Sequence, residues 1–599
     1  MMKRLLFLIL IANVTLFAMT KKTDKNVIDD WEYNSTIESK DATRTMQNAG
    51  YTKGGVVAMS VPTPKSFRSV KKVGLAVGGA KDTNNFKANI EKGYLPKLDS
   101  ITYEGQFYQH YFDTGLNGKS CKDLFCPSYS SAKRLNSFSD ESEYFLSVGL
   151  NSGIEEGNFK RKKLNLVVVL DISGSMGTAF DAYHYDNMGN RVNNDKSDKH
   201  KKKMEIATES IVAMLSHLKD DDRLGIALFD HGAYKAKPLS LVGNSDKEAI
   251  REHILALTER GGTNWSAGYK EGLKLFEGIN TSDPLYENRI IFLTDAMPNT
   301  GELSKNKLFG LAKNASEKNI HTTFVGVGVD FNNDLVEYVS KTKGANYFSV
   351  HSSSAFSKLL DEEFEYMVTP LVYDLELKLN SSNYAIEAVY GSPDANMATG
   401  QIMKVNTLFP SKNDGTATKG GIVLLKLKKI GEGSKNDIKL NVSYKDVNGK
   451  AFSNVQKVSF KNNNSYYYDN SGIEKAILVS DYVTIMKNWL IDTRAACNDD
   501  VKWIMQPTPA IMKRVMEYPP KRPLYPVVPT WEKRSCKLKV SAGYKKLFQA
   551  FKKIYVNEMN LIGDESLNME LDILNTLIGQ KTSTLTPIKK NVDDWQFKN

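Results

Sequence analysis

The chain has 599 residues, and its hydrophobic content of 41% is ordinary for a globular protein. This length is enough for about three or four domains. The 80 lysine and arginine residues exceed the 69 aspartate and glutamate residues, so the formal net charge of +11 is modest. The densest basic run, residues 200–203, is short and is interpreted as a solvated loop. Nucleic-acid binding requires a concentrated basic stripe or a reading motif, so we expect no nucleic-acid partner.

The N-terminus has the pattern of an export signal. Lys3 and Arg4 precede an apolar run over residues 5–17, and a polar segment follows. This order predicts a secretory signal peptide over residues 1–18. Leu16 makes the cleavage site imperfect, so an uncleaved anchor stays an alternative. No other run approaches about 18 apolar residues, so we expect no further transmembrane segment and a secreted, periplasmic or cell-surface location.

Two regions precede the central part of the chain. Residues 19–60 are polar and rich in serine, threonine, asparagine and lysine, which predicts a flexible leader. Residues 61–160 are predicted to form an N-terminal α+β region. Within it we expect a helix at 84–92 and a strand at 143–150 that leads into the next domain.

The most informative stretch of the sequence begins with five apolar residues, 166–170, which run directly into Asp171. An uninterrupted run of this kind predicts a strand buried on both faces, as in a parallel sheet. Ser173 and Ser175 follow at every second position, so all three side chains project to one side of an extended loop. Open α/β sheets bind ligands at the carboxyl ends of their strands. Oxygen donors at this place favour magnesium, manganese or calcium over zinc.

Two further oxygen donors occur in matching contexts. Thr263 lies in a glycine-rich loop before an amphipathic helix, and Asp295 ends a second buried strand. Asp171 could instead cap a helix, but a cap would not require these two partners. Helices and strands alternate over residues 161–370, which predicts a doubly wound, mostly parallel sheet with helices on both faces.

The order Asp-x-Ser-x-Ser, then threonine, then aspartate resembles the metal-ion-dependent adhesion site of the von Willebrand factor type A (VWA) family. The resemblance covers roughly residues 161–370, and it implies a Rossmann-like domain. It further implies a divalent cation, Mg²⁺ or else Mn²⁺ or Ca²⁺, that coordinates an Asp or Glu carboxylate of a partner protein. The ligands that the resemblance assigns are Asp171, Ser173, Ser175, Thr263 and Asp295. Two carboxylates and three neutral hydroxyls leave such an ion able to accept one more carboxylate.

The rim of this site is expected to select the partner. Asp230 and His231 follow a predicted strand and are rim candidates, although an ordinary surface turn explains them equally well. Trp265, beside Thr263, is either a recognition aromatic or a residue of helix packing. Residues 181–200 form an insertion after the metal loop. It is a mobile loop, a second cation site or a recognition loop.

The pattern changes after residue 370. Short strands separated by turns predict an antiparallel β-sandwich over residues 371–465, and residues 466–599 are mainly helical. Because the strand at 143–150 precedes the VWA region and strands follow it, we expect the VWA domain to be inserted into the sandwich. In this architecture the chain is distantly similar to the inter-alpha-trypsin inhibitor heavy chains and to exported bacterial VWA proteins.

Four cysteines in an exported chain indicate disulfides. Cys121 and Cys126 are expected to close a local loop, and Cys497 to pair with Cys536. Zinc is the alternative, but the sequence has no Cys-x-x-Cys and no paired histidines.

For function, the sequence favours a non-enzymatic adhesion or scaffold protein. A metal-dependent hydrolase is the first alternative, but the sequence has neither His-Glu-x-x-His nor Gly-x-Ser-x-Gly. The site also has no general base besides the two ligand carboxylates. A periplasmic assembly factor of an envelope complex, which would use the same metal chemistry, is the second alternative.

Overall fold

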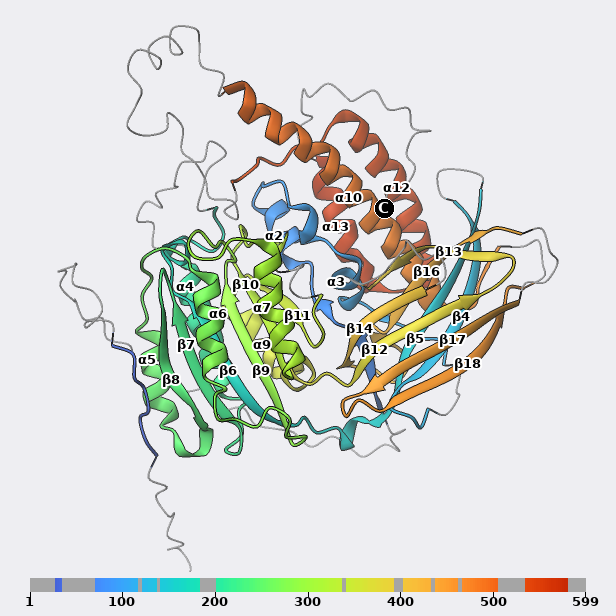
Figure 1. The fold of residues 1–599 in the computed structure, drawn as a ribbon. Coiled ribbons are helices and arrows are strands. Elements are labelled where there is room, and N and C mark those ends of the chain that lie inside the picture. The colour runs from blue at the N-terminus through green and yellow to red at the C-terminus, as the bar shows by residue number, and fades with distance from the viewer. Residues whose placement is uncertain are drawn as a thin grey trace, which may run out of the picture.

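A computed structural model describes residues 27–34, 71–116, 121–136, 141–183, 201–334, 336, 341–392, 402–431, 437–461, 466–504 and 534–579. Two sheets lie side by side, and a group of helices from the C-terminal region packs along one side of them (Figure 1). The predicted signal segment and residues 184–200 of the insertion lie outside the described residues. Among the described helices, none is long and apolar enough to cross a membrane.

The VWA region forms a seven-stranded sheet in the order β2-β11-β10-β9-β6-β7-β8. All neighbours are parallel except β7 and β8, which are antiparallel. The strands are β2 (Gly79–Ala80), β6 (Lys163–Asp171), β7 (Arg223–Phe229), β8 (Ala233–Leu241), β9 (Tyr286–Thr294), β10 (Ile320–Val327) and β11 (Asn346–Val350). The predicted parallel sheet is therefore confirmed.

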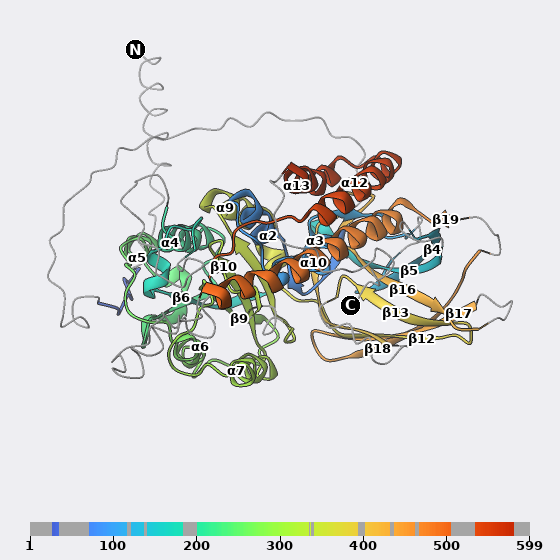
Figure 2. The same cartoon turned by 90° about the horizontal axis from the view of Figure 1, so that it is seen from above.

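Helices cover both faces of this sheet, as Figure 2 shows. On one face lie α4 (Lys203–Leu215), α5 (Lys247–Leu255) and α9 (Ser353–Val368), and on the other lie α6 (Trp265–Lys274) and α7 (Lys305–Glu317). In β6, Leu166, Val168 and Leu170 face the first group, while Val167 and Val169 face the second. Because both faces of the strand are buried, its sequence is continuously apolar.

The second sheet is antiparallel and ten-stranded, and it takes strands from both sides of the VWA region. Its main path runs β13-β16-β5-β1-β14-β12-β17-β18, and β4 and β19 extend it from β5. The strands are β1 (Lys72–Val77), β4 (Cys126–Leu135), β5 (Ser142–Glu155), β12 (Val372–Asn380), β13 (Tyr384–Tyr390), β14 (Ile402–Ser411), β16 (Ile422–Lys429), β17 (Asp437–Asp446), β18 (Ala451–Ser459) and β19 (Tyr467–Tyr468). Apolar side chains from both halves of the path share one core.

The predicted insertion of the VWA domain is correct. β5 pairs antiparallel with β16, with Gly149 opposite Ile422 and Tyr144 opposite Leu427. The chain leaves this sheet after β5 and returns to it at β12, directly after α9. The proposed boundary between an N-terminal region at 61–160 and a sandwich at 371–465 is wrong, because β1, β4 and β5 belong to the same sheet as the later strands.

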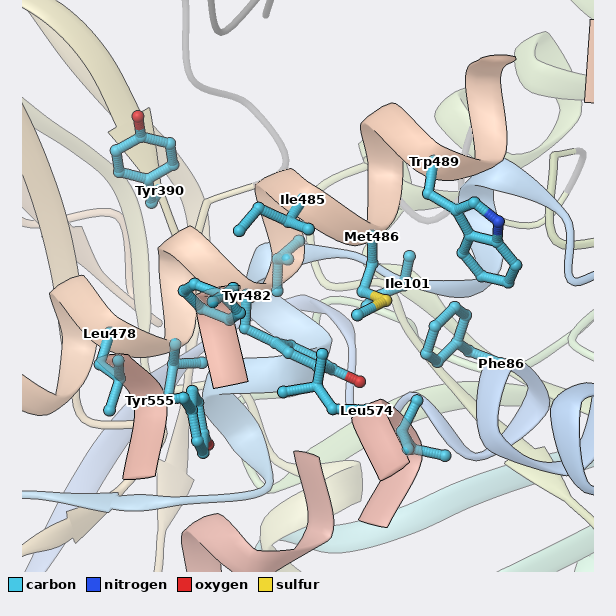
Figure 3. Close-up of a cluster of buried hydrophobic side chains, with 14 of the residues drawn as sticks. Phe86, Ile101, Tyr390, Leu478, Tyr482, Ile485, Met486, Trp489, Tyr555 and Leu574 are labelled. Carbon is cyan, nitrogen blue, oxygen red and sulfur yellow. The ribbon is translucent and has the colours of Figure 1, made fainter. Parts of the chain in front are cut away.

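The described part of the C-terminal region is mainly helical, as predicted, although it also contributes β19 to the antiparallel sheet, and it does not stand alone. α10 (Ser471–Ile504), α12 (Ala542–Ile562) and α13 (Asn568–Gly579) share a core with α2 (Asn84–Glu91) and α3 (Tyr103–Tyr108). Figure 3 shows Phe86 and Ile101 of the N-terminal region lying among Tyr482, Met486 and other side chains of the helices. The C-terminal helices and the N-terminal helices α2 and α3 are therefore packed around one hydrophobic core.

The two sheets are joined by an uninterrupted piece of chain. β1 ends in the antiparallel sheet and β2 begins at the edge of the VWA sheet two residues later. Gly78 donates to Thr407 O at 2.8 Å, and Gly79 donates to Ala345 O at 3.4 Å. Gly79 has a φ of 92°, a conformation that glycine adopts without steric cost.

Part of the predicted flexible leader packs against the VWA domain. Residues 27–34 run along β8 and α5 of the VWA domain, where Asp30 Oδ2 accepts from the buried Lys237 Nζ at 2.8 Å. Trp31 stacks on His253 with ring centroids 5.1 Å apart. The expectation of a flexible leader over 19–60 is therefore wrong for this segment, because an ion pair and an aromatic stack hold it.

The cysteine prediction is confirmed for one pair. Cys121 and Cys126 form a disulfide. Cys536 is disulfide-bonded as well, but the side chain of its predicted partner, Cys497, lies outside the described residues.

Candidate metal site

The metal-site candidates lie at the carboxyl edge of the VWA sheet. β6 ends at Asp171 and its neighbour β9 ends at Thr294, in parallel register with Leu170 opposite Leu293. Asp171 is fully buried: Oδ1 accepts from Ser173 N at 2.9 Å, and Oδ2 accepts from Thr294 Oγ1 at 2.6 Å. The carboxylate that ends the apolar run is thus held in one orientation.

The two predicted serines and the threonine loop meet beside Asp171. The Ser173 and Ser175 hydroxyl oxygens are 3.2 Å apart. Between them, Gly174 N donates to Gly261 O at 3.1 Å, which ties this loop to the glycine-rich loop that carries Thr263. Thr263 is buried, and its backbone N donates to Asn299 Oδ1 at 2.8 Å.

Asp295 supplies the second carboxylate. It is buried directly after β9, and its Oδ1 has no hydrogen-bond partner. The next residue, Ala296, has a φ of 55°, which is the left-handed region that non-glycine residues rarely adopt. Such strain clusters at functional sites, where the surrounding structure holds it in place.

The electrostatics of the site fit a cation. Burial, together with the neighbouring Asp295 carboxylate, raises the pKa of Asp171 from 3.8 to about 7. A divalent ion would stabilise the ionised form of Asp171 and could be bound by the unpartnered oxygen of Asp295. Among the described residues, no group of three or more His, Cys, Asp or Glu side chains could hold a metal. A cation here would therefore depend on the serine and threonine hydroxyls, which suits magnesium.

A buried lysine lies beside these carboxylates. Lys203, the first residue of α4, is fully buried, and its Nζ lies 3.1 Å from Asp295 Oδ2 and 2.6 Å from Asp330 Oδ1. The interpretation of 200–203 as a solvated loop is wrong for this residue. Nothing in a run of lysines indicates which one turns inward, so the sequence held no signal for Lys203. Asp330 comes shortly after the buried strand β10, much as Asp171 and Asp295 lie at the ends of theirs, and this position was the available signal.

The two rim candidates that follow β7 differ in their exposure. The Asp230 carboxylate is buried and accepts from Gly232 N at 2.8 Å, from Tyr234 Oη at 3.0 Å and from Arg260 Nε at 2.9 Å. It is therefore committed to holding its own loop. The His231 side chain is 66% exposed and remains a rim candidate.

Trp265 is not a recognition residue. It is fully buried, with its ring centroid 5.2 Å from that of Tyr269 and 4.9 Å from that of Phe292. It anchors α6 against the sheet, so the alternative interpretation as helix packing is correct.

Comparisons with known proteins match the region that holds the candidate site. The family model of the von Willebrand factor type A domain matches residues 165–362. Inter-alpha-trypsin inhibitor heavy chain H1 of Mesocricetus auratus is 22% identical over 225 residues, which cover 37% of this chain and 22% of that protein. Uncharacterized protein sll0103 of Synechocystis sp. is 28% identical over 184 residues, 30% of this chain and 36% of that protein.

Among solved structures, von Willebrand factor type A from Catenulispora acidiphila aligns with a TM-score of 0.38 and 14% identity, covering 63% of this chain and 81% of that chain. The chain matches only about a fifth of the length of the heavy chains it resembles. From the family model, the parallel sheet and the order of its elements, we conclude that residues 165–362 form a von Willebrand factor type A domain.

Proposed function

We propose that this chain is an exported, non-enzymatic binding protein whose VWA domain captures a partner protein through a divalent cation. Mg²⁺ is the cation that fits best, with Mn²⁺ and Ca²⁺ as alternatives. Asp171, Ser173, Ser175, Thr263 and Asp295 would hold it. The bound ion would supply Lewis acidity toward an Asp or Glu carboxylate of the partner.

The observation that carries this proposal is the pair of buried carboxylates. Asp171 has a raised pKa, and Asp295 Oδ1 is buried without a hydrogen-bond partner. Burying a carboxylate without a compensating partner costs folding free energy, and natural proteins contain such groups mainly at functional sites. Both carboxylates would be metal ligands, which leaves neither as a general base and supports binding over hydrolysis.

Two further features support export. The N-terminal sequence has the pattern of a signal peptide. The Cys121–Cys126 disulfide is typical of proteins that fold in an oxidising compartment.

The test is a calorimetric titration of Mg²⁺ and Mn²⁺ into the full chain after dialysis against EDTA. We expect saturable binding that Asp171→Ala abolishes. Asp361→Ala is the matched control, because that carboxylate lies on α9 and is 66% exposed. Loss of binding in both variants, or the absence of binding to the unmodified chain, would refute the proposal.

The partner is tested in a second step. Surface or envelope proteins captured by the immobilised chain in Mg²⁺ should be released by EDTA and should not bind Asp171→Ala. If neither EDTA nor Asp171→Ala reduced the amount of captured protein, another surface of the chain would be responsible for the binding.

A further inference from the structure

Lys203 connects the metal site to a carboxylate outside the predicted ligand set. Its ammonium group is 0% exposed and lies between Asp295 Oδ2, at 3.1 Å, and Asp330 Oδ1, at 2.6 Å. A buried lysine is normally costly and is retained when it is paired on both sides. Here the two carboxylates lie within ion-pair distance of the ammonium group and compensate its charge.

The surrounding backbone is shaped to admit this side chain. Gly328 has a φ of 94°, and a Cβ at this position would lie 2.7 Å from Lys203 Cε. Any other residue would therefore collide with the lysine stem as well as strain the backbone. At the other end, Lys203 N donates to Thr178 O at 3.0 Å, which fixes the start of α4.

The position of Asp330 is fixed from the N-terminal region. Lys97 Nζ donates to Asp330 O at 2.7 Å and to Phe331 O at 2.9 Å. From α2, Asn89 Nδ2 donates to Val329 O at 2.8 Å. These bonds hold the segment after β10 against the VWA domain, so the Lys203–Asp330 pair is built rather than incidental.

Lys203 divides the two oxygens of Asp295 between different roles. Oδ2 accepts from the ammonium group, whereas Oδ1 is buried and has no hydrogen-bond partner. The backbone of Asp295 is also fixed, because Asn332 N donates to its carbonyl at 3.0 Å. The carboxylate is thus oriented with one oxygen committed and the other available.

We propose that Lys203 is the positioning residue of the metal site, and that it keeps metal affinity moderate so that the bound ion can still accept a carboxylate. This rests on the proposed metal site. With a divalent ion bound, Asp171, Asp295 and Asp330 would carry three negative charges and Lys203 one positive charge, so the loaded cluster would have no net charge. Without the ammonium group, the loaded cluster would be negative, bind its ion more tightly and repel an incoming carboxylate.

The experiment measures Mg²⁺ affinity by calorimetry on the full chain and three variants. Lys203→Met should bind Mg²⁺ at least tenfold more tightly than the unmodified chain, and Asp330→Asn at least threefold more weakly. The double variant, Lys203→Met with Asp330→Asn, has the same cluster charge as the unmodified chain. Its Mg²⁺ affinity should lie within about threefold of that of the unmodified chain. Lys202→Met is the control, because this neighbouring lysine is 50% exposed and pairs with Glu259 at the surface; it should change nothing.

A merely structural role for Lys203 predicts a different order, since disruption would weaken Mg²⁺ binding in every variant that lacks it. Equal or weaker binding by folded Lys203→Met would overturn the inference. If that variant does not fold, Asp330→Asn and the double variant decide, and a double variant weaker than Asp330→Asn overturns it. An unmodified chain that binds no Mg²⁺ removes the proposed function together with this inference. If the unmodified chain binds Mg²⁺ but the affinities of the variants do not follow the cluster charge, the inference about Lys203 fails and the proposed function stands.

Discussion

Raising the pH should destabilise the metal-free protein through Asp171. Burial and Asp295 raise the pKa of this carboxyl from 3.8 to about 7, so between these pH values the folded chain holds a proton that the unfolded chain has released. Stability therefore falls as pH rises through this window. A shift of about three units corresponds to roughly 4 kcal/mol in total, of which about 2 kcal/mol is lost between pH 5.5 and 8.

The assay is thermal unfolding in EDTA across this pH range, with Asp171→Asn as the reference that lacks the titrating group. Ionisable groups remote from Asp171 contribute equally to both proteins, so the difference between the two curves reports Asp171 and its interaction with Asp295. We expect the unmodified chain to lose about 4–8 °C more than the variant, given the melting shift per kcal/mol of a domain of this size. Saturating Mg²⁺ should remove the difference, because a bound ion stabilises the ionised form. If the melting temperatures of the two proteins in EDTA changed with pH in the same way, the assignment of the pH-dependent loss of stability to Asp171 would be refuted.

Three further substitutions test the packing that positions the site. Asp222→Ala should cost about 3–5 kcal/mol in denaturant unfolding, because Asp222 pairs with the buried Arg161 guanidinium through two contacts of 2.8 and 2.6 Å; a cost under about 1 kcal/mol would contradict this. Gly268→Ala should cost about 1–3 kcal/mol, because its Cβ would lie 2.4 Å from a phenylalanine ring of β7, whereas Gly310→Ala on α7 meets no atom within 4 Å and serves as control. Glu570→Ala should speed amide hydrogen exchange in α13, because it removes the partner of the buried His110 Nε2, at a cost of about 1–3 kcal/mol; unchanged exchange would argue against a structural role.

The VWA domain was predictable because its signals are local. The apolar run before Asp171 and the serines after it lie within one strand and one loop, and the periodicity of the flanking helices is equally short-range. The insertion into the antiparallel sheet was also predictable from the order of the strands. Each strand and helix was recognised from a pattern within one element, and the insertion followed from the order of those elements along the chain.

The features that were missed depend on contacts between distant parts of the chain. Lys203 reads as one of several lysines in a polar stretch, and only the folded chain places it between Asp295 and Asp330. Trp265 was open to two interpretations, a recognition aromatic or a residue of helix packing. The first turn of α6 points its ring into the core with Phe292, and its position beside Thr263 could not decide between the two. Proximity in sequence to a ligand does not fix the direction in which a side chain points.

The proposed metal site is also supported by contacts from a region that the sequence assigned to another domain. Asn89 of α2 donates to Val329 O at 2.8 Å and accepts from Tyr183 Oη at 2.9 Å, so it joins α2 to the segment that presents Asp330. Asn89→Ala should release this segment and shift Mg²⁺ affinity in the direction of Asp330→Asn, by a smaller factor of two or so. Hydrogen exchange should rise at the segment that follows β10 while β6 keeps its protection. Unchanged affinity and exchange would show that the VWA domain holds its metal site alone, and the contacts from α2 would then serve only to dock the two regions.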